Sequence, residues 1–450
     1  MARVKTFALC EEKPSERIWF PVLRHCWRQS FYSPAMETSP TEPTQIDRLS
    51  GLPDALLLTI FSLLPTCVAA RTSVLSRRFK HLWKACPTVN LSFYKPNTSF
   101  EAMANGALLS RLPSNPLLRL HLFIGPAFSG VPDSFVSSLL THAHSLGLHH
   151  LTFINYEDIQ SIVRTIFSIS SLESLSIFSL DTFSEITLPS ATPLAHLRSL
   201  FIKNRVSSVQ VEQLLLELCC LDHLQLTHLV QSTAATVKLS SLTVKKLEVF
   251  AFSRFERGTC FVGLFMPSLE FLYLSKRYNG PVPYIDADIP LLRKSIISLD
   301  CLYPEHVAAV AQLLNCISHV EELRLDLKER SEYPFCNLLE PCKEAPAFPN
   351  LKHLDARMCF HDHNFEAVVS LLHRSPALQS LKLVHKVADE FDSMTGEKRK
   401  MYDWRSTLPR NVNGNYQHAY FNNLHLKKNN DEFMMLLNKS STPKKLKAHY

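Results

Sequence analysis

A short leucine pattern, L-x-x-L-x-L, recurs along most of this 450-residue chain and constrains its fold more than any other feature. The first apolar position of each copy, which we call its anchor, lies 23 to 31 residues before the next one. Ten copies in near register exceed chance alignment in a leucine-rich chain, and such a period is typical of stacked structural repeats. The anchors are Leu148, Leu172, Leu197, Leu221, Val244, Leu269, Ile296, Val320, Leu351 and Leu378.

This period lies in the leucine-rich-repeat range, in which each copy supplies a short strand and a returning helix or loop. One copy cannot bury its own leucines, whereas stacked copies share a continuous core. We therefore expect an α/β fold with an irregular leucine-rich-repeat solenoid, or horseshoe, over residues 88–385. Less regular copies should begin near Val89 and Leu118. The usual Asn or Cys eight residues after the anchor is replaced by Leu180, Arg205, Leu229 and Arg277, which indicates a non-uniform curve.

Residues 47–87 differ from the repeats and predict three short helices. Pro53 and Pro65 bracket the first helix, because proline is favoured at a helix start and disfavours its continuation. Ser76 is suited to cap the third helix at its N-terminus. A module of this size is too small to be stable alone, so it should lean on a partner or on the next domain. The apolar stripe of the first helix consists of Leu57, Ile60, Phe61 and Leu64.

Composition argues against catalysis and against cofactors. The chain has only 10 glycines and contains neither a dinucleotide-binding G-x-G-x-x-G motif nor a P-loop. It also lacks the G-x-S-x-G motif that exposes a nucleophilic serine. Its 12 cysteines form no C-x-x-C pair, so we expect neither a metal site nor a bound cofactor. A Cys/His nucleophilic pair is not excluded by sequence, but chance proximity explains such pairs equally well.

The two ends of the chain predict segments outside the folded core. Residues 1–46 lack regular patterning and an uninterrupted apolar run, so we expect a disordered leader rather than a secretion signal. The most apolar run, Ala55 to Leu64, is about half the length that a membrane span requires. Residues 386–450 hold twelve Lys/Arg against seven Asp/Glu, and thus +5 of the net charge of +7. We expect a basic, partly irregular tail in a protein of the cytoplasm, the nucleus or both, without membrane or nucleic-acid binding.

Two phrases of the helical segment, SGLPDALLLTIFSLLPT and ARTSVLSRRFKHLW, resemble the F-box of plant F-box proteins that carry leucine-rich repeats. From about residue 345, FPNLKHLDARMCF and SPALQSLKLV are similar to the opening of the FBD domain of that family. The resemblance implies a non-catalytic receptor subunit of an SCF-type, cullin-RING ubiquitin ligase. Its F-box, residues 47–87, would dock onto a Skp-type adaptor and through it onto cullin. The implied adaptor contacts are Leu52, Pro53, Leu57, Ile60, Leu64, Val74, Leu75, Phe79, Leu82 and Trp83.

The repeats would hold the target protein for ubiquitination on their concave sheet face. Side chains alternate across a strand, so residues between the buried leucines should point onto that face. An error of one residue in the register would place the same set in the core. Parity also selects Lys203, Lys246, Glu248 and His353. The main candidates are Phe201, His223, Gln225, Phe250, Phe271, Tyr273, Arg324, Asp326, Asp355 and Arg357.

Two alternatives to the receptor remain open. The first is a leucine-rich-repeat scaffold that binds partners without ligase coupling, favoured if Phe79 and Cys67, which depart from the family pattern, prevent adaptor docking. The second is nucleic-acid binding through the basic tail, which predicts a steep dependence of affinity on salt.

Overall fold

The computed structural model describes residues 51–93, 100–109, 111, 114–125, 131–179, 185–231, 236–254, 260–276, 282–300, 306–328, 347–358, 371–372, 374–385 and 418–422. The chain divides into two compact units, residues 1–52 and 53–450. Of the first unit only Gly51 and Leu52 are described, so the predicted leader lies outside the described residues. Most of the predicted tail lies outside them as well.

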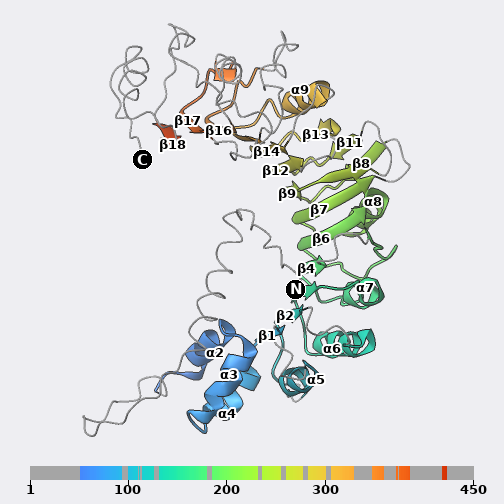
Figure 1. The fold of residues 1–450 in the computed structure, drawn as a ribbon, viewed down its shortest axis with the longest axis vertical. Coiled ribbons are helices and arrows are strands. Elements are labelled where there is room, and N and C mark those ends of the chain that lie inside the picture. Colours follow the sequence, from blue (N-terminus) through green and yellow to red (C-terminus); the bar gives the residue numbers. More distant parts are fainter. Residues whose placement is uncertain are drawn as a thin grey trace, which may run out of the picture. The chain divides into compact units, whose positions relative to one another are not determined.

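A cluster of short helices opens the second unit (Figure 1). The α-helices α2 (Asp54–Ser62), α3 (Thr66–Arg71) and α4 (Phe79–Leu82) are joined by the 3₁₀ segments η1 (Thr72–Val74) and η2 (Trp83–Ala85). The helical pattern is thus more divided than three simple helices. Ser76 acts as predicted, since its Oγ accepts a hydrogen bond of 3.1 Å from the Phe79 N–H. Phe61 and Phe79 pack edge to face, with ring centroids 5.7 Å apart.

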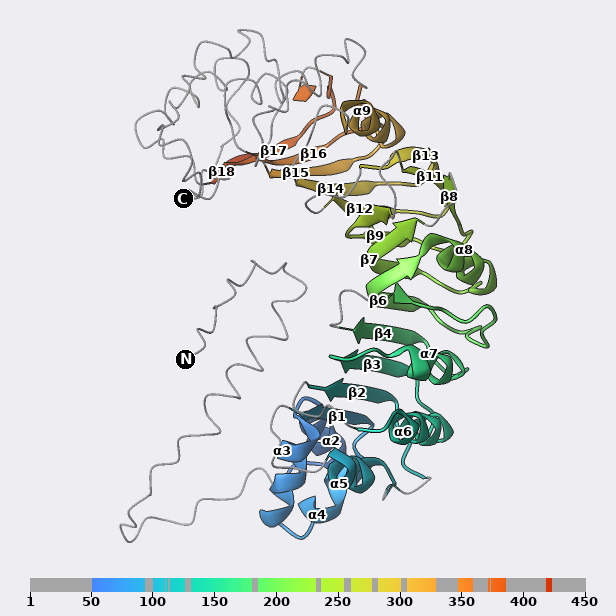
Figure 2. The same ribbon diagram turned by 45° about the vertical axis from the view of Figure 1, so that its right-hand side comes forward.

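The rest of the described chain is dominated by one parallel sheet, whose main strands lie side by side in the order in which they occur in the sequence (Figure 2). The strand order is β1-β2-β3-β4-β6-β7-β9-β12-β14-β15-β16-β17-β18. Each repeat therefore contacts mainly its neighbours, as expected for a stacked array. The strands are β1 (Thr88–Phe93), β2 (Arg119–Ile124), β3 (His150–Asn155), β4 (Ser174–Ser179), β6 (Ser199–Ser207), β7 (His223–Gln231), β9 (Lys246–Val249), β12 (Phe271–Lys276), β14 (Lys294–Asp300), β15 (Glu322–Lys328), β16 (His353–Met358), β17 (Ser380–His385) and β18 (His418–Asn422).

The sheet has two chemically different faces. Leucines such as Leu120, Leu122 and Leu151 are fully buried and form the leucine face, which packs against helices. Intervening residues such as His121 and Phe123 are half-buried and form what we call the open face. Helices lie along one side of the sheet in both views (Figures 1 and 2). They are α5 (Phe100–Ala104), the π-helix η3 (Asn105–Leu109), α6 (Asp133–Ser145), α7 (Gln160–Phe167), α8 (Ser208–Glu217) and α9 (Val307–Cys316).

The structure confirms most repeat anchors and corrects one. Nine of the ten predicted anchors are buried, but Ile296 lies on the open face, in register with Tyr273 and Arg324. The anchor of that repeat is Leu292, which is buried two residues before β14. The error arose because β14 reads Ser-Ile-Ile-Ser-Leu, where apolar residues occupy both faces and hide the period of two.

The segments that return from strands β7, β9 and β12 form strands rather than helices. A second parallel sheet has the order β13-β11-β8, with β8 (Thr236–Ser240), β11 (Phe261–Phe265) and β13 (Tyr284–Asp288). Two small strands, β5 (Glu185–Ile186) and β10 (Phe252–Arg254), pair with β6 and β7. β-branched and aromatic residues such as Phe261, Val262, Tyr284 and Ile285 occur in these returns and favour extended backbone.

Three buried polar side chains form a row beside the position, eight residues after the anchor, where such repeats usually carry Asn or Cys. They lie one residue before that position. Asn155 and Ser179 end β3 and β4, Asn204 lies at a shift in register within β6, and each is at most 5 % exposed. Asn204 Oδ1 accepts a hydrogen bond of 2.6 Å from the Arg205 N–H, and Ser179 Oγ donates to the Glu157 carbonyl at 3.4 Å. These side chains satisfy backbone groups at a strand end and at the shift in register within β6, as buried polar groups generally do.

Charged side chains alternate in sign along one edge of the sheet. The residue one position before each of nine successive strands donates its N–H to the carbonyl of the equivalent residue in the preceding repeat, so these positions are neighbours. We call this row the charge ladder. Asp222 illustrates it, because its carboxylate lies 3.4 Å from Arg198 and 3.6 Å from Lys245. After His149, which begins the row, the charges read Glu173, Arg198, Asp222, Lys245, Glu270, Arg293, Glu321 and Lys352.

Candidate protein-interaction surfaces

The helical module exposes large apolar side chains on two of its segments. Leu56, Ile60 and Leu63 follow one another at helical spacing along α2, and Leu63 is 76 % exposed. Val74 and Leu75, at η1, are 85 % and 66 % exposed. Aliphatic side chains left this open to water cost free energy unless another molecule covers them, so such groups mark interaction surfaces.

The predicted adaptor contacts do not all lie on that surface. Leu57 and Phe79 are 0 % and 1 % exposed, so they form the core of the module rather than its surface. Trp83 packs against the core of the repeat sheet. Leu56 and Leu63 were missed by sequence reasoning, because the predicted stripe joined Leu57 to Ile60 and so mixed two faces of α2. The remaining predicted contacts are half-buried or exposed, namely Leu52, Pro53, Ile60, Leu64, Val74, Leu75 and Leu82.

A buried arginine joins the module to the first repeats. Arg111 is 5 % exposed, and its guanidinium donates to three backbone carbonyls. They belong to Cys86, at the end of the module, and to Asn115 and Pro116, before β2, the latter two at 3.1 Å and 3.2 Å. Burial lowers the pKa of Arg111 from its ordinary value. The Asn90 N–H also donates to Thr66 Oγ1 at 2.8 Å, which links β1 to α3.

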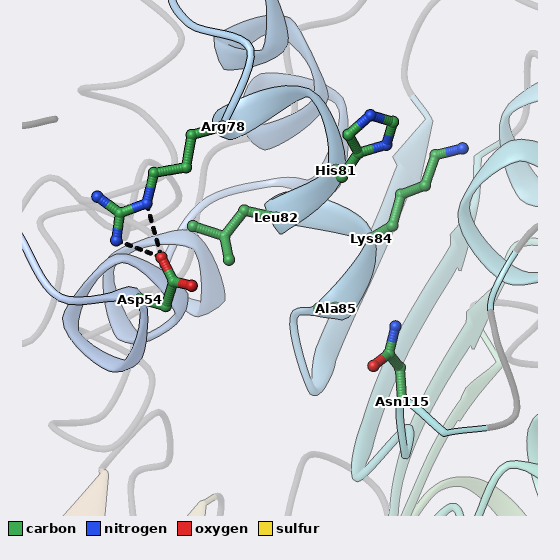
Figure 3. Close-up of a pocket in the computed structure, with 7 residues that line it drawn as sticks. All are labelled: Asp54, Arg78, His81, Leu82, Lys84, Ala85 and Asn115. Carbon is green, nitrogen blue, oxygen red and sulfur yellow. Dashed lines mark hydrogen bonds and ion pairs between the residues drawn. The ribbon is translucent and has the colours of Figure 1, made fainter.

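A cavity of about 470 Å³ lies where the module meets the loop before β2 (Figure 3). Arg78 Nε donates to Asp54 Oδ1 at 2.7 Å and ties α4 to the start of α2. The lining contains no hydroxyl or thiol side chain, and its one carboxylate is paired with this arginine. The lining residues are Asp54, Arg78, His81, Leu82, Lys84, Ala85 and Asn115.

Along the main strands of the first half of the sheet, the open face carries cationic and aromatic residues but no acid, and Glu185 of the short strand β5 is in register with Arg205. The sequences of β1, β2, β3, β4, β6 and β7 contain no Asp or Glu. Phe178 and Phe201 pack edge to face with centroids 4.6 Å apart, and the Lys203 ammonium lies 5.9 Å from the Phe178 ring centroid. Burial, together with Arg119, lowers the pKa of His121 and of His150, so both rings favour the neutral form.

Along the second half, the open face carries acids, and Glu248, Glu322, Asp326 and Asp355 each lie beside a cation. Arg357 Nη2 donates to Asp355 Oδ2 at 2.8 Å, and Arg324 Nη2 to Asp326 Oδ2 at 3.4 Å. Lys246 Nζ lies 2.6 Å from Glu248 Oε1. Burial alone would raise the pKa of Glu248, but hydrogen bonds with His223 and Lys246 outweigh burial and lower the pKa.

The predicted target-facing residues share this open face in continuous rows. The register aligns Phe201 with Gln225, and Arg324 with Asp355. His223 and Phe271 both align with Lys246, and Tyr273 aligns with Glu248. Tyr273 and Asp326 are 5 % and 8 % exposed, so they support their neighbours more than they present a surface. Phe250, which follows β9, is half-buried and its ring lies 4.8 Å from that of Tyr273.

No described helix has the length and apolar character to span a bilayer. Among the described side chains, no group of three or more His, Cys, Asp or Glu is arranged to hold a metal ion. The molecule so defined is a helical module with exposed apolar side chains, followed by a parallel sheet of stacked repeats. Exposed apolar side chains beside a sheet of stacked repeats are typical of proteins that bind other proteins.

Comparison with known proteins identifies the module. The F-box domain family matches residues 49–89, which include all the helices from α2 to η2, so the chain is an F-box protein. An Arabidopsis thaliana protein whose name describes it as an F-box/LRR-repeat protein is 25% identical over 414 residues, covering 85% of this chain and 91% of its own. An FBD-associated F-box protein of the same plant is 26% identical over 356 residues, 75% and 83% of the two chains. An F-box/FBD/LRR-repeat protein is 33% identical over 174 residues, 36% and 38% of the two chains. The chain is therefore a plant F-box/LRR-like protein.

Proposed function

We propose that this chain is the non-catalytic substrate-recognition subunit of an SCF-type, cullin-RING ubiquitin ligase. Its F-box binds a Skp-type adaptor, and its stacked strands, an irregular leucine-rich-repeat solenoid, hold a target protein on the open face for ubiquitination in the cytoplasm or the nucleus. The observation that carries this proposal is the F-box match over a module that exposes five large aliphatic side chains. A receptor needs no catalytic residue, because holding the target near the conjugating enzyme raises its effective concentration.

Within the F-box, we assign adaptor contact to Leu56, Ile60 and Leu63 on α2 and to Val74 and Leu75 at η1. Apolar side chains at helical spacing are the usual anchors when helices bind a groove. Leu57 and Phe79 support these anchors from the core, and the aromatic pair of Phe61 and Phe79 holds α2 against α4. Phe79 therefore affects adaptor binding through the fold of the module rather than by contact.

The net charge of the module indicates which charge the adaptor should carry around its apolar groove. Residues 51–87 contain five Lys/Arg and one acid, Asp54, a difference of +4, and Arg78 already binds that acid. An adaptor with acidic residues at the rim of its groove complements this charge and accelerates association. We therefore expect the association rate with the adaptor to fall as salt concentration rises, because salt screens exposed charges.

The test is co-purification of the full chain with a plant Skp-type adaptor. The double variant Val74→Asp/Leu75→Asp places two carboxylates on the exposed apolar surface, where they do not disturb the core. We expect at least a tenfold loss of adaptor recovery, since desolvating each carboxylate at an apolar interface costs about 1 kcal/mol or more. Leu242→Asp is the matched control, because Leu242 is 76 % exposed and lies in the repeat region.

Equal recovery of the wild-type chain and the double variant contradicts the receptor proposal. A chain that never binds the adaptor while its repeats still bind protein targets is the leucine-rich-repeat scaffold without ligase coupling. Equal thermal unfolding midpoints of the double variant and the Leu242→Asp control show that both are folded. The same pull-down then distinguishes the two outcomes.

A further inference from the structure

We propose that the target segment carries an aspartate or glutamate next to a large apolar side chain, and that it docks on the open face of strands β3 to β6. This inference rests on the proposed receptor function and names the chemistry of its target. The docking surface consists of Ile154, Phe178, Phe201 and Lys203, which are all half-buried. The carboxylate would bind the Lys203 ammonium, and the apolar side chain would lie on the aromatic pair beside it.

The register brings these residues together. Ile154 is aligned with Phe178, which is aligned in turn with Lys203 on the next strand. Phe201 lies two positions before Lys203 and so shares its face, since side chains alternate along a strand. The edge-to-face contact of the two phenylalanines, at 4.6 Å, holds both rings on the sheet. An apolar group can therefore be covered here without moving the strands.

Charge selects an acidic partner over a basic one. Strands β1 to β7 of the main path contribute Arg119, Lys203 and Arg205 to the sheet and no acidic residue. The distance of 5.9 Å from the Lys203 ammonium to the Phe178 ring centroid places this charge beside the apolar site. Among the described residues, no carboxylate lies within 4 Å of Lys203. A carboxylate of the target gains an ion pair with Lys203 without breaking one, and the acid of the adjoining strand β5, Glu185, is in register with Arg205 rather than with Lys203.

The second half of the open face does not offer the same site. Arg324, Asp326, Asp355 and Arg357 neutralise one another, and Lys246 and Lys294 each lie 2.6 Å from a glutamate. A charged target residue would have to displace an existing partner there. A single ammonium also suits a carboxylate, whereas phosphate recognition typically uses clustered arginines.

The experiment selects peptides from a phage-displayed library of random 12-mers on the immobilised full chain. We expect Asp and Glu next to Phe, Leu, Ile or Met to be enriched about two- to fivefold over the unselected library, the gain typical of a partly exposed ion pair. Lys203→Glu should abolish this enrichment and favour Lys or Arg instead. Lys382→Glu is the matched control, because Lys382 is half-buried on the open face of β17 and should leave the preference unchanged.

Three results overturn the inference: no enrichment over uncoated matrix, an acidic preference that survives Lys203→Glu, or its equal loss in Lys382→Glu. Phe178→Ser provides a second readout, in which the acidic preference should persist while the apolar preference declines. Adaptor recovery is measured on the same preparation. Loss of adaptor binding with an intact acidic preference contradicts the receptor function alone, and the reverse result contradicts the docking surface alone.

Discussion

At the scale of single residues, burial separates side chains that the sequence pattern grouped together. Leu57 and Ile60 both fit the apolar period of α2, yet one is fully buried and the other is 37 % exposed. A helix with apolar residues on more than one face gives no period that tells its core from its surface. Likewise, Ile296 and Ile297 are adjacent and equally apolar, and only the register shows that Ile297 enters the core.

His121 predicts how stability depends on pH. Its pKa is lowered first by burial and then by Arg119 and His150, so the unfolded chain binds a proton at higher pH than the folded chain does. The stability that neutral His121 contributes is therefore fully present above the unfolded-state pKa of about 6.5. It is lost as pH falls towards the lowered pKa of the folded state. We expect His121→Asn to reduce the fall in thermal midpoint between pH 7.5 and pH 5. His353→Asn, at an exposed site, is the control, and an equal fall in both variants contradicts this assignment.

At the scale of elements, the strands were predictable and their returns were not. A strand buried on one face repeats every two residues, so nine anchors stood out from the sequence. The returns vary among helix, strand and irregular chain, because they need only cover the leucine face. The second sheet at β8, β11 and β13 could have been suspected from Phe261-Val262 and Tyr284-Ile285, where β-formers gather without a helical period.

Arg111 predicts how firmly the F-box is joined to the first repeats. Arg111→Met keeps the length of the side chain but removes all donors to the carbonyls of Cys86, Asn115 and Pro116. We expect a loss of about 2–4 kcal/mol in the free energy of unfolding, because buried carbonyls lose a charged donor. Denaturant midpoints measure this loss, and limited proteolysis should reveal faster cleavage near Pro87. Arg119→Met, at an exposed arginine of β2, should change stability by less than about 0.5 kcal/mol.

At the scale of the whole molecule, the charge ladder gives each repeat a sign opposite to that of its neighbours. Eight successive repeats follow this alternation from Glu173 to Lys352. Stacking a repeat on its second neighbour instead of its first would bring like charges together. The ladder thus opposes skipped or exchanged repeats, a hazard in arrays whose units resemble one another. Sequence reasoning had the leucine period but overlooked this row, because each charge directly follows an apolar anchor and looks like an ordinary surface position.

Asp222 tests the ladder, since its carboxylate lies near both Arg198 and Lys245. Asp222→Asn should lower the free energy of unfolding by about 0.5–1 kcal/mol, the typical value of exposed ion pairs. Asp222→Lys should cost more than Asp222→Asn, because three cations then follow one another. The difference between the two variants should shrink in 1 M salt, where the Debye length is about 3 Å. An equal cost for both variants at low salt would show that the alternation of sign contributes nothing.

The parallel alignment of the strands also sets the spacing that a bound segment must match. Neighbouring strands are about 4.8 Å apart, and an extended peptide advances about 3.3 Å per residue. A segment laid across the strands comes back into step after about three of its residues, which span two strands. Its contacts should therefore recur at every third position, and a recognition motif for this surface would be written with two variable residues between its specified ones.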